Sequence, residues 1–212
     1  MLKKVLKNMA GTADCMLICL PGIGLVGSLA GELFMEAASE ISPLLEFYPE
    51  SLLYVSGASK EGLISPPKIT VNKIHLPEVG DLMIVRGSSQ PTTQTNQYEL
   101  AEKLVKVAEN FGVKILIGIG GYAVAQIGEK RKTYLSSSDW RVSIIGASAG
   151  FLPLRGTVVG AAGLAPGLAS LHGLNSACIL VETGGESPDL IAAKTAYNNV
   201  MIFLKKYFTD SL

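Results

Sequence analysis

The stretch Leu20-Pro21-Gly22-Ile23-Gly24-Leu25-Val26-Gly27 decides the fold of this chain. It follows a short apolar run, 15–20, and opens a longer apolar stretch that ends near residue 35. A buried strand, a glycine turn and the N-terminus of a helix, met in that order, are typical of an α/β protein. The spacing of Gly22, Gly24 and Gly27 also fits a dinucleotide-binding fingerprint.

Strand and helix signals alternate along the rest of the chain. Apolar runs predict strands at 15–20, 52–56, 69–76, 82–85, 113–118, 142–146, 157–159 and 177–182. Helical spacing and helix-start signals predict helices at 24–38, 97–111, 164–172 and 188–208. Buried strands that alternate with helices predict a single α/β domain over residues 1–212, with three layers and a mostly parallel central sheet. The strand 69–76 alternates apolar and polar residues, so we expect it near an edge of that sheet.

Net charge and composition limit the classes of partner that this chain can have. The 212 residues carry 18 basic and 18 acidic side chains, so the net charge is zero and no strong field attracts nucleic acid or an anionic membrane. Hydrophobic residues make up 48% and charged residues only 17%. A chain with so many apolar residues has too few polar side chains to cover its whole surface. We therefore expect part of that surface to be buried in a homo-oligomer.

The cysteines and histidines predict no metal site or cofactor. Cys15, Cys19 and Cys178 all lie in apolar runs, which indicates buried free thiols in a reducing cytoplasm. Cys15 and Cys19 lie about 13 Å apart along a strand, too far for one metal or one disulfide. We expect His75 to face solvent and His172 to interact with a helix C-terminus.

Lysines before the first apolar run raise the possibility of a signal peptide or a membrane span. Lys3, Lys4 and Lys7 precede residues 15–31, but Pro21 and four glycines interrupt that stretch, and Glu32 follows it. We therefore interpret it as a buried strand and helix, with no membrane partner.

Glycine-rich or polar loops follow four of the predicted buried strands. In open α/β sheets, ligands bind beyond the carboxyl ends of the strands, so these loops predict a ligand crevice. The alternative is that the glycines only permit tight turns. The candidate crevice residues are Gly22, Gly24, Gly27, Ser88, Gln90, Gly120, Gly121, Glu182 and Glu186. A buried Glu182 needs a partner, for which Arg155 or Arg86 could serve.

Two sequence motifs, one for a dinucleotide cofactor and one for a catalytic serine, lack the acidic residues that such sites also need. A dinucleotide site needs an acidic residue at the end of the next strand, and neither Glu40 nor Glu46 clearly supplies it. Gly146-Ala147-Ser148-Ala149-Gly150 matches a nucleophile elbow, but residues 149–171 contain no Asp or Glu to follow it. We therefore predict no catalytic residues.

Several motifs, in order along nearly the whole chain, resemble the proteasome assembly chaperone family, in its archaeal branch. They are the turn 21–27, Gln90-Pro91 with Tyr98, Gly118-Ile119-Gly120-Gly121, the glycine-framed loop 156–164, the strand 177–183 with Glu182, and Pro188-Asp189 followed by Ala192-Ala193. The resemblance implies a three-layer α/β fold similar to nucleoside phosphorylases. It also implies homo-oligomers and a role in assembling 20S proteasome α subunits or binding the finished particle.

The end of the sequence departs from that family. Members that dock on the proteasome often end in a hydrophobic residue, a tyrosine and one more residue, whereas this sequence ends Thr209-Asp210-Ser211-Leu212. The leading hypothesis is a non-enzymatic, homo-oligomeric, cytoplasmic interaction protein. The alternative is a binder of, or enzyme for, a nucleotide or phosphorylated ligand, ATP-grasp-like or phosphorylase-like, that uses the glycine crevice with phosphate at the N-terminus of the first helix.

Overall fold

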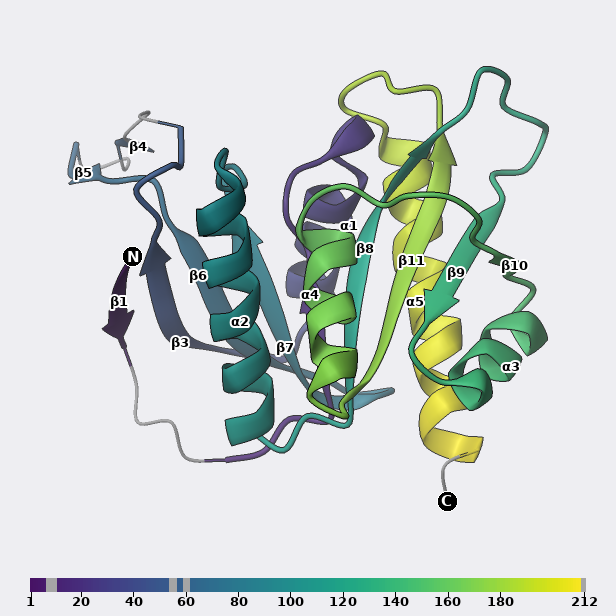
Figure 1. Ribbon diagram of the computed structural model, residues 1–212, viewed down its shortest axis with the longest axis horizontal. Coiled ribbons are helices and arrows are strands. Elements are labelled where there is room, and N and C mark those ends of the chain that lie inside the picture. The colour runs from purple at the N-terminus through teal and green to yellow at the C-terminus, as the bar shows by residue number, and fades with distance from the viewer. Residues whose placement is uncertain (7–10, 54–56, 59–61, 211–212) are drawn as a thin grey trace.

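A computed structural model describes residues 1–6, 11–53, 57–58 and 62–210. Its main sheet has nine strands in the order β1-β3-β6-β7-β2-β8-β11-β9-β10 (Figure 1). The strands are β1 (Leu2–Val5), β2 (Cys15–Ile18), β3 (Glu40–Tyr48), β6 (Ile69–Leu76), β7 (Gly80–Gly87), β8 (Ile115–Ala123), β9 (Thr133–Ser137), β10 (Leu152–Pro153) and β11 (Asn175–Thr183). A separate small sheet pairs β4 (Gly57–Ala58) with β5 (Ile64–Ser65).

Five α-helices accompany the sheet: α1 (Val26–Ala37), α2 (Gln94–Asn110), α3 (Trp140–Ser148), α4 (Ala161–Leu171) and α5 (Leu190–Asp210). A short 3-10 turn, Ile23–Leu25, precedes α1. Helix α2 starts three residues before its predicted start because Thr93 caps it: the Thr93 hydroxyl accepts a hydrogen bond from the Asn96 N–H at 3.4 Å.

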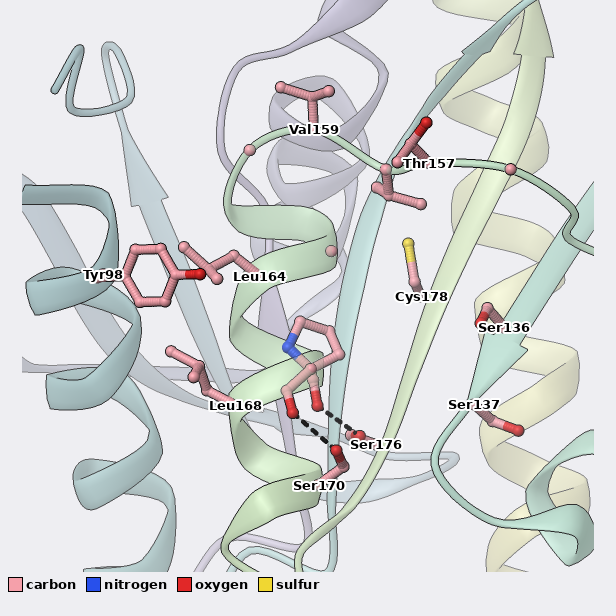
Figure 2. A pocket seen from close by; sticks show the side chains of 16 residues that line it. Tyr98, Ser136, Ser137, Thr157, Val159, Leu164, Leu168, Ser170, Ser176 and Cys178 are labelled. Carbon is pink, nitrogen blue, oxygen red and sulfur yellow. Dashed lines mark hydrogen bonds between the residues drawn. The ribbon is translucent and has the colours of Figure 1, made fainter. Parts of the chain in front are cut away.

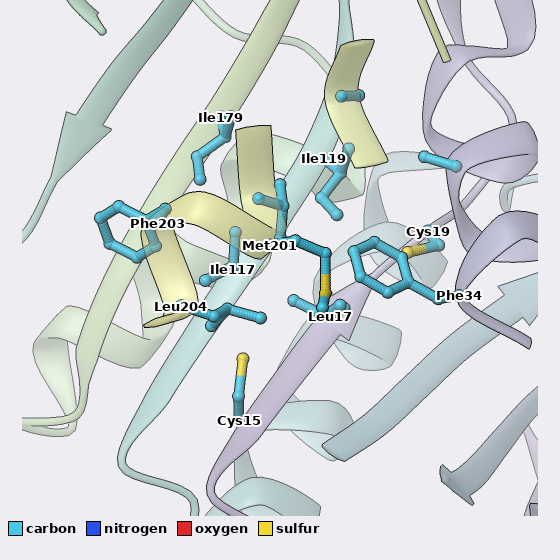
Figure 3. Close-up of a cluster of buried hydrophobic side chains, with 14 of the residues drawn as sticks. Cys15, Leu17, Cys19, Phe34, Ile117, Ile119, Ile179, Met201, Phe203 and Leu204 are labelled. Carbon is cyan, nitrogen blue, oxygen red and sulfur yellow. The ribbon is translucent and has the colours of Figure 1, made fainter. Parts of the chain in front are cut away.

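Two separate hydrophobic clusters show that the fold has three layers. On one face, α1 and α5 pack against Cys15, Leu17 and Cys19 (Figure 3). On the other face, α2 and α4 pack against Met16 and Ile18 (Figure 1). Neighbouring residues of β2 therefore belong to different clusters, because side chains alternate between the two faces of a strand. Every residue of β2 is buried for this reason.

The expectation of a mostly parallel sheet is wrong, because the sheet is mixed. Four neighbouring pairs are antiparallel: β1–β3, β3–β6, β6–β7 and β9–β11. The parallel pairs are β7–β2, β2–β8, β8–β11 and β9–β10. A tight turn between Leu76 and Gly80 joins β6 directly to β7, so no crossover helix intervenes there and the two strands must be antiparallel.

Several predicted elements also need correction. Residues 142–146, predicted as a strand, lie in helix α3, whose first turn is capped by Asp139. A short apolar run occurs in buried strands and in buried helices alike, so its sequence alone does not distinguish the two. Residues 157–159 form a loop and not a strand. Of the predicted strand 52–56, residues 54–56 lie outside the described residues, and 52–53 belong to no strand.

Strand β6 lies inside the sheet, between β3 and β7, and not near its edge. Two of its polar side chains contact Asp81 on the neighbouring strand β7. Lys73 Nζ lies 2.6 Å from Asp81 Oδ2, and His75 Nδ1 lies 2.8 Å from Asp81 Oδ1. The polar residues of this interior strand thus include an ion pair, Lys73 with Asp81, and a contact between His75 and the same carboxylate.

The three cysteines are free and buried, as the sequence predicts. Burial raises the thiol pKa of Cys19 and of Cys178 to about 12, and it also raises that of Cys15. Within the described residues, none of the helices combines the length and the apolar character needed to cross a bilayer.

Candidate functional site at the carboxyl ends of the central strands

The chain changes direction across the sheet at β2. From β2 it passes through α1 on one face and returns along β3, β6 and β7, which all lie on one side of β2. From β7 it passes through α2 on the opposite face and enters β8, which lies on the other side of β2 (Figure 1). The carboxyl ends of β2 and β8 therefore form a topological switch point, where open α/β sheets bind their ligands.

A cavity of about 540 Å³ lies at this switch point. We call it the switch-point crevice; it is lined by Leu20, Gly22, Ile23, Gln90, Gln97, Ile119, Gly120, Gly121, Tyr122, Ala123, Thr157, Val158, Val159, Gly160, Ala162 and Leu180. Its volume is within the range of small-molecule sites, about 300–1,000 Å³. Four of the candidate residues lie together here: Gly22, Gln90, Gly120 and Gly121.

Gln90 fastens three loops around the crevice. Its Nε2 donates to the carbonyl oxygen of Pro21 at 2.6 Å, and its Oε1 accepts from the backbone N–H of Ala161 at 2.9 Å. Gln97 Nε2 donates to Pro91 O at 2.7 Å and to Gln90 Oε1 at 3.3 Å. Gln90 therefore joins the turn after β2, the loop after β7 and the N-terminus of α4.

Gly24 and Gly27 lie beside the crevice in packed positions. Gly24 has a left-handed φ of +63°, and a Cβ there would lie 2.8 Å from the hydroxyl of Thr183. A Cβ on Gly27 would clash with the carbonyl oxygen of Ile119 and would lie 3.0 Å from that of Leu20. Glycine therefore permits α1 to approach the strands closely at Gly27, and it permits the turn before α1 to approach Thr183 at Gly24.

Ser88 lies in a different hollow. A cavity of about 680 Å³ on the β6–β7 side is lined by Ser88 and Ser89 together with Arg86 and Glu32. Arg86 Nη2 pairs there with Glu32 Oε1 at 3.3 Å. The structure therefore does not bring Ser88 together with Gln90, although the two are close in sequence.

Glu182 is buried at the end of β11, but its partners are not the arginines that we expected. Its Oε1 accepts a hydrogen bond from the hydroxyl of Tyr134 at 2.8 Å, and its Oε2 accepts from the backbone N–H of Lys132 at 3.1 Å. The hydrogen bond to Glu182 raises the pKa of Tyr134. These partners replace Arg155 and Arg86 because β9, which sequence patterns missed, pairs antiparallel with β11. Glu186 is exposed in the loop that follows.

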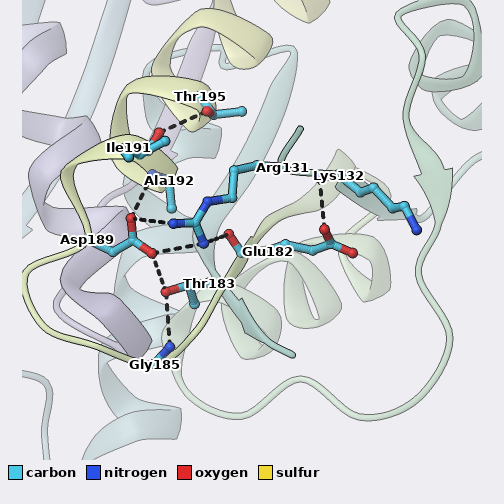
Figure 4. Close-up of polar contacts among 9 residues, drawn as sticks. All are labelled: Arg131, Lys132, Glu182, Thr183, Gly185, Asp189, Ile191, Ala192 and Thr195. Atoms are coloured by element: carbon cyan, nitrogen blue, oxygen red, sulfur yellow. Dashed lines mark hydrogen bonds and ion pairs between the residues drawn. The ribbon is translucent and has the colours of Figure 1, made fainter. Parts of the chain in front are cut away.

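Asp189 is the centre of a polar network that sequence patterns missed (Figure 4). Its Oδ2 lies 3.1 Å from Arg131 Nη1 and accepts from the hydroxyl of Thr183 at 2.7 Å. Its Oδ1 accepts from Arg131 Nη2 at 3.2 Å and from the backbone N–H of Ala192 at 3.0 Å. Burial alone raises the carboxyl pKa, but the bonds from Thr183 and Ala192 and the charge of Arg131 outweigh it, so the pKa of Asp189 is lowered.

A further hollow of about 660 Å³ borders α4 and shares the loop 157–160 with the switch-point crevice. In Figure 2, Leu164 and Leu168 point from α4 toward Tyr98 of α2, whereas Cys178 and Ser136 lie on the other side of α4. Beneath α4, Ser176 donates to the carbonyl oxygen of Pro166 at 2.7 Å. The lining contains no charged side chain.

The other residues considered from the sequence lie away from the crevice. Ser148 lies on α3 and donates to the carbonyl oxygen of Ile145 at 2.8 Å, so the sequence that matches a nucleophile elbow is a helix end. His172 Nδ1 pairs with Glu109 Oε1 at 3.0 Å beyond the end of α4. His75 lies on β6 and is exposed.

Three of the crevice residues with polar side chains escaped sequence reasoning: Gln97, Tyr122 and Thr157. Gln97 lies in the first turn of α2, and Tyr122 follows the Gly120-Gly121 pair on β8. The glycine pair was a usable signal for Tyr122, because it marks the same strand end. Thr157 lies in the glycine-framed loop 156–164, but residues 157–159 were predicted to form a strand, so it was not chosen as a candidate.

The comparisons with known proteins agree with this fold. The model of the PAC2 family matches residues 16–209. An uncharacterised protein of Methanocaldococcus jannaschii is 31% identical over 186 residues, which cover 82% of this chain and 67% of that protein.

Two solved structures from Pyrococcus furiosus are similar over almost the whole chain. One is PbaB, described as an archaeal proteasome activator, with 26% identity, a TM-score of 0.86, and 99% of this chain and 93% of that chain covered. The other is PbaA, described as an archaeal homologue of proteasome-assembly chaperone, with 20% identity, a TM-score of 0.77, and 98% and 82% covered. The resemblance to the proteasome assembly chaperone family is thereby confirmed, and this chain belongs to the PAC2 family.

Proposed function

We propose that this chain is a non-enzymatic, homo-oligomeric interaction protein of the cytoplasm that acts on 20S proteasome α subunits, free or assembled. The observation that carries the proposal is the match to PbaB, which covers 99% of this chain at a TM-score of 0.86. PbaA, described as an archaeal homologue of proteasome-assembly chaperone, shares the fold.

The carboxyl end of the sheet carries apolar side chains suited to contact a partner. We call Ile23, Ile127, Val159, Leu190 and Ile191 the apolar rim, and all five are exposed, Val159 by 92% and Ile191 by 67%. Ile23 and Val159 line the same crevice. The start of α5 adjoins them, because the N–H of Asp189 donates to the carbonyl oxygen of Gly24 at 2.9 Å. Apolar side chains gathered at one end of a molecule mark interaction sites.

A second apolar patch supports self-association. Trp140 and Ile144 on α3 and Leu152 on β10 are exposed at the end of the main sheet, beside a hollow of about 320 Å³. Strand edges that lack a neighbour favour pairing with another chain. We propose that this edge joins copies of the chain, while the apolar rim contacts the proteasome subunits.

Reconstitution with purified components tests the proposal. Native mass spectrometry of the purified chain should give a homo-oligomer, and addition of recombinant 20S α subunits from the same organism should give a mixed complex. Ile144→Glu should reduce the oligomer to smaller species, whereas the matched control Leu171→Glu, at the far end of α4, should not. A chain that stays monomeric and forms no complex with α subunits in any mixture contradicts the proposal.

A further inference from the structure

Helix α3 leaves an apolar stripe on its outer side. Its buried residues, Val142 and Gly146, face the rest of the fold. Trp140, Ile144 and Ala147 follow the i, i+4 and i+7 spacing of the opposite face, and all three are exposed, Trp140 by 65% and Ile144 by 57%. A large aromatic and a branched aliphatic side chain left in water one turn apart favour burial against another apolar surface.

An apolar hollow lies beside this stripe, at the end of the main sheet where α3 and β10 meet (Figure 1). It has a volume of about 320 Å³, and Leu135 and Phe151 are buried residues that line it. Ala147 and Pro153 line it as well, and none of its described lining residues is charged. Trp140 is not one of the lining residues, so its ring does not fill the hollow of its own chain.

The edge strand β10 offers little to an added strand. It has only two residues, and the N–H of Leu154, which follows it, donates to the carbonyl oxygen of Leu135 on β9 at 2.8 Å. Because the N–H groups of an extended chain alternate between its two sides, the nitrogen of Pro153 faces the open edge, and proline carries no N–H. A second copy at this edge therefore pairs through side chains and not by extending the sheet.

Antiparallel pairing of two α3 helices matches the stripe of one copy to the hollow of the other. In a pair related by a two-fold axis every contact occurs twice, once in each direction. With the axis at Ile144, Trp140 lies about 6 Å from it along the helix, since each residue advances about 1.5 Å. Ala147 and Ser148 lie at a similar distance on the other side of the axis. The Trp140 ring of one copy therefore lies opposite Ala147 and the hollow of the second copy.

Charge favours the same antiparallel arrangement. Arg141 is exposed and lies over the ring of Trp140, with 5.6 Å from Cζ to the ring centroid. Antiparallel pairing brings this guanidinium toward the C-terminal end of the other α3, where carbonyl groups carry partial negative charge and the last turn contains no basic side chain. A parallel pair would instead place the two Arg141 side chains near each other, and like charges in contact oppose association.

We infer that two copies of the chain pair through α3 about a two-fold axis, with Trp140 of each copy inserted into the hollow that Leu135, Ala147 and Pro153 line in the other. This inference rests on the self-association proposed above and assigns it a geometry. Each copy supplies the apolar surface that the other lacks, because the exposed ring and the apolar hollow lie on the same side of one chain and cannot fill each other within it.

The fluorescence of Trp140 tests the inference, because it is the only tryptophan of the 212 residues. The purified full chain is measured over a dilution series, with native mass spectrometry at the same concentrations. As copies associate, the emission maximum should shift to shorter wavelength and quenching by acrylamide should fall. An oligomer whose Trp140 emits and is quenched as in the dilute chain overturns the inference, yet leaves the proposed self-association and the contact with α subunits standing. A chain that is monomeric throughout overturns the inference and the self-association together.

Variants locate the contact. Ala147→Glu places a charge at the hollow and should leave Trp140 exposed at every concentration without lowering the melting temperature. Ala125→Glu is the matched control, because it makes the same change at an exposed position in the loop after β8, and it should behave as the wild type does. If Ala147→Glu fails to fold, the wild-type dilution series alone decides.

A mixture of two variants shows whether the ring enters the other copy. Trp140→Ala keeps the hollow but has no tryptophan, so all fluorescence of its mixture with Ala147→Glu comes from the Ala147→Glu copy. The mixture should regain the shift to shorter wavelength that Ala147→Glu lacks when it is alone. Protection of Trp140 in Ala147→Glu alone, or no protection in the mixture at concentrations where the wild type is protected, overturns the inference.

Discussion

Arg131 and Asp189 form an ion pair, with 3.1 Å between Nη1 and Oδ2, that joins the loop after β8 to the start of α5. Arg131 Nη1 also donates to the backbone carbonyl oxygen of Glu182 at the end of β11. Both charged side chains are largely buried, by 87% and 92% of their surface. A single pair thus holds together three segments that carry or border the apolar rim.

Removal of the cation should therefore destabilise the protein. Arg131→Met leaves the Asp189 carboxylate buried without its counter-charge and should lower the free energy of unfolding by about 2–3 kcal/mol at neutral pH. Urea denaturation followed by circular dichroism measures the loss. Lys106→Met, on the exposed side of α2, is the matched control and should change stability by less than about 0.5 kcal/mol. Equal stability of Arg131→Met and wild type would show that the pair is not structural.

The same pair predicts a pH dependence. The pKa of Asp189 is lowered in the folded protein, so its stabilising contribution is fully present above the unfolded-state pKa of about 3.9 and is lost as the pH falls through the folded-state pKa. The stability difference between wild type and Arg131→Met should thus be largest near neutral pH and should shrink in acid. Unfolding curves between neutral pH and about pH 3 measure it. A difference that stays constant over this range contradicts the assignment.

Two glycines of the opening turn should respond differently to substitution. Gly27→Val forces a side chain against the carbonyl oxygens of Ile119 and Leu20 and should cost about 1–3 kcal/mol or more through overpacking. Gly22→Ala, five residues earlier, should leave the free energy of unfolding within about 0.5 kcal/mol of wild type. Thermal or urea unfolding of both variants provides the test. Equal stability of Gly27→Val and wild type would disprove the packing role.

The opening turn also shows how far sequence reasoning reaches. Its glycine spacing predicted the strand, the turn and helix α1 correctly, because these depend on residues that are neighbours in the chain. Gln90 lines the crevice with three of the candidate glycines, since residues at strand ends converge in space, but its role in binding a ligand stays a prediction. Gln97 and the partners of Glu182 could not be found in this way. Both depend on which distant segments pack together, and the missed strand β9 supplies Tyr134.

The cysteines should be inert in the native state. Burial raises the thiol pKa of Cys19 and Cys178 to about 12, so almost no reactive thiolate exists at pH 8, and burial also raises the pKa of Cys15. Iodoacetamide at that pH should leave all three unmodified in the folded protein and alkylate all three in urea, as intact mass measures. Rapid alkylation of Cys178 in the folded protein would show that the hollow beside α4 admits solvent to that thiol.

The most direct test of the central claim is a tagged pull-down from a lysate of the source organism, quantified by mass spectrometry. Three baits are compared: wild type, a rim variant with Ile127→Asp and Ile191→Asp, and Leu171→Asp as a more exposed apolar control outside the rim. The account predicts that 20S proteasome α subunits are enriched by wild type and by Leu171→Asp, and that the rim variant loses them. Absence of proteasome α subunits from the wild-type capture would contradict it.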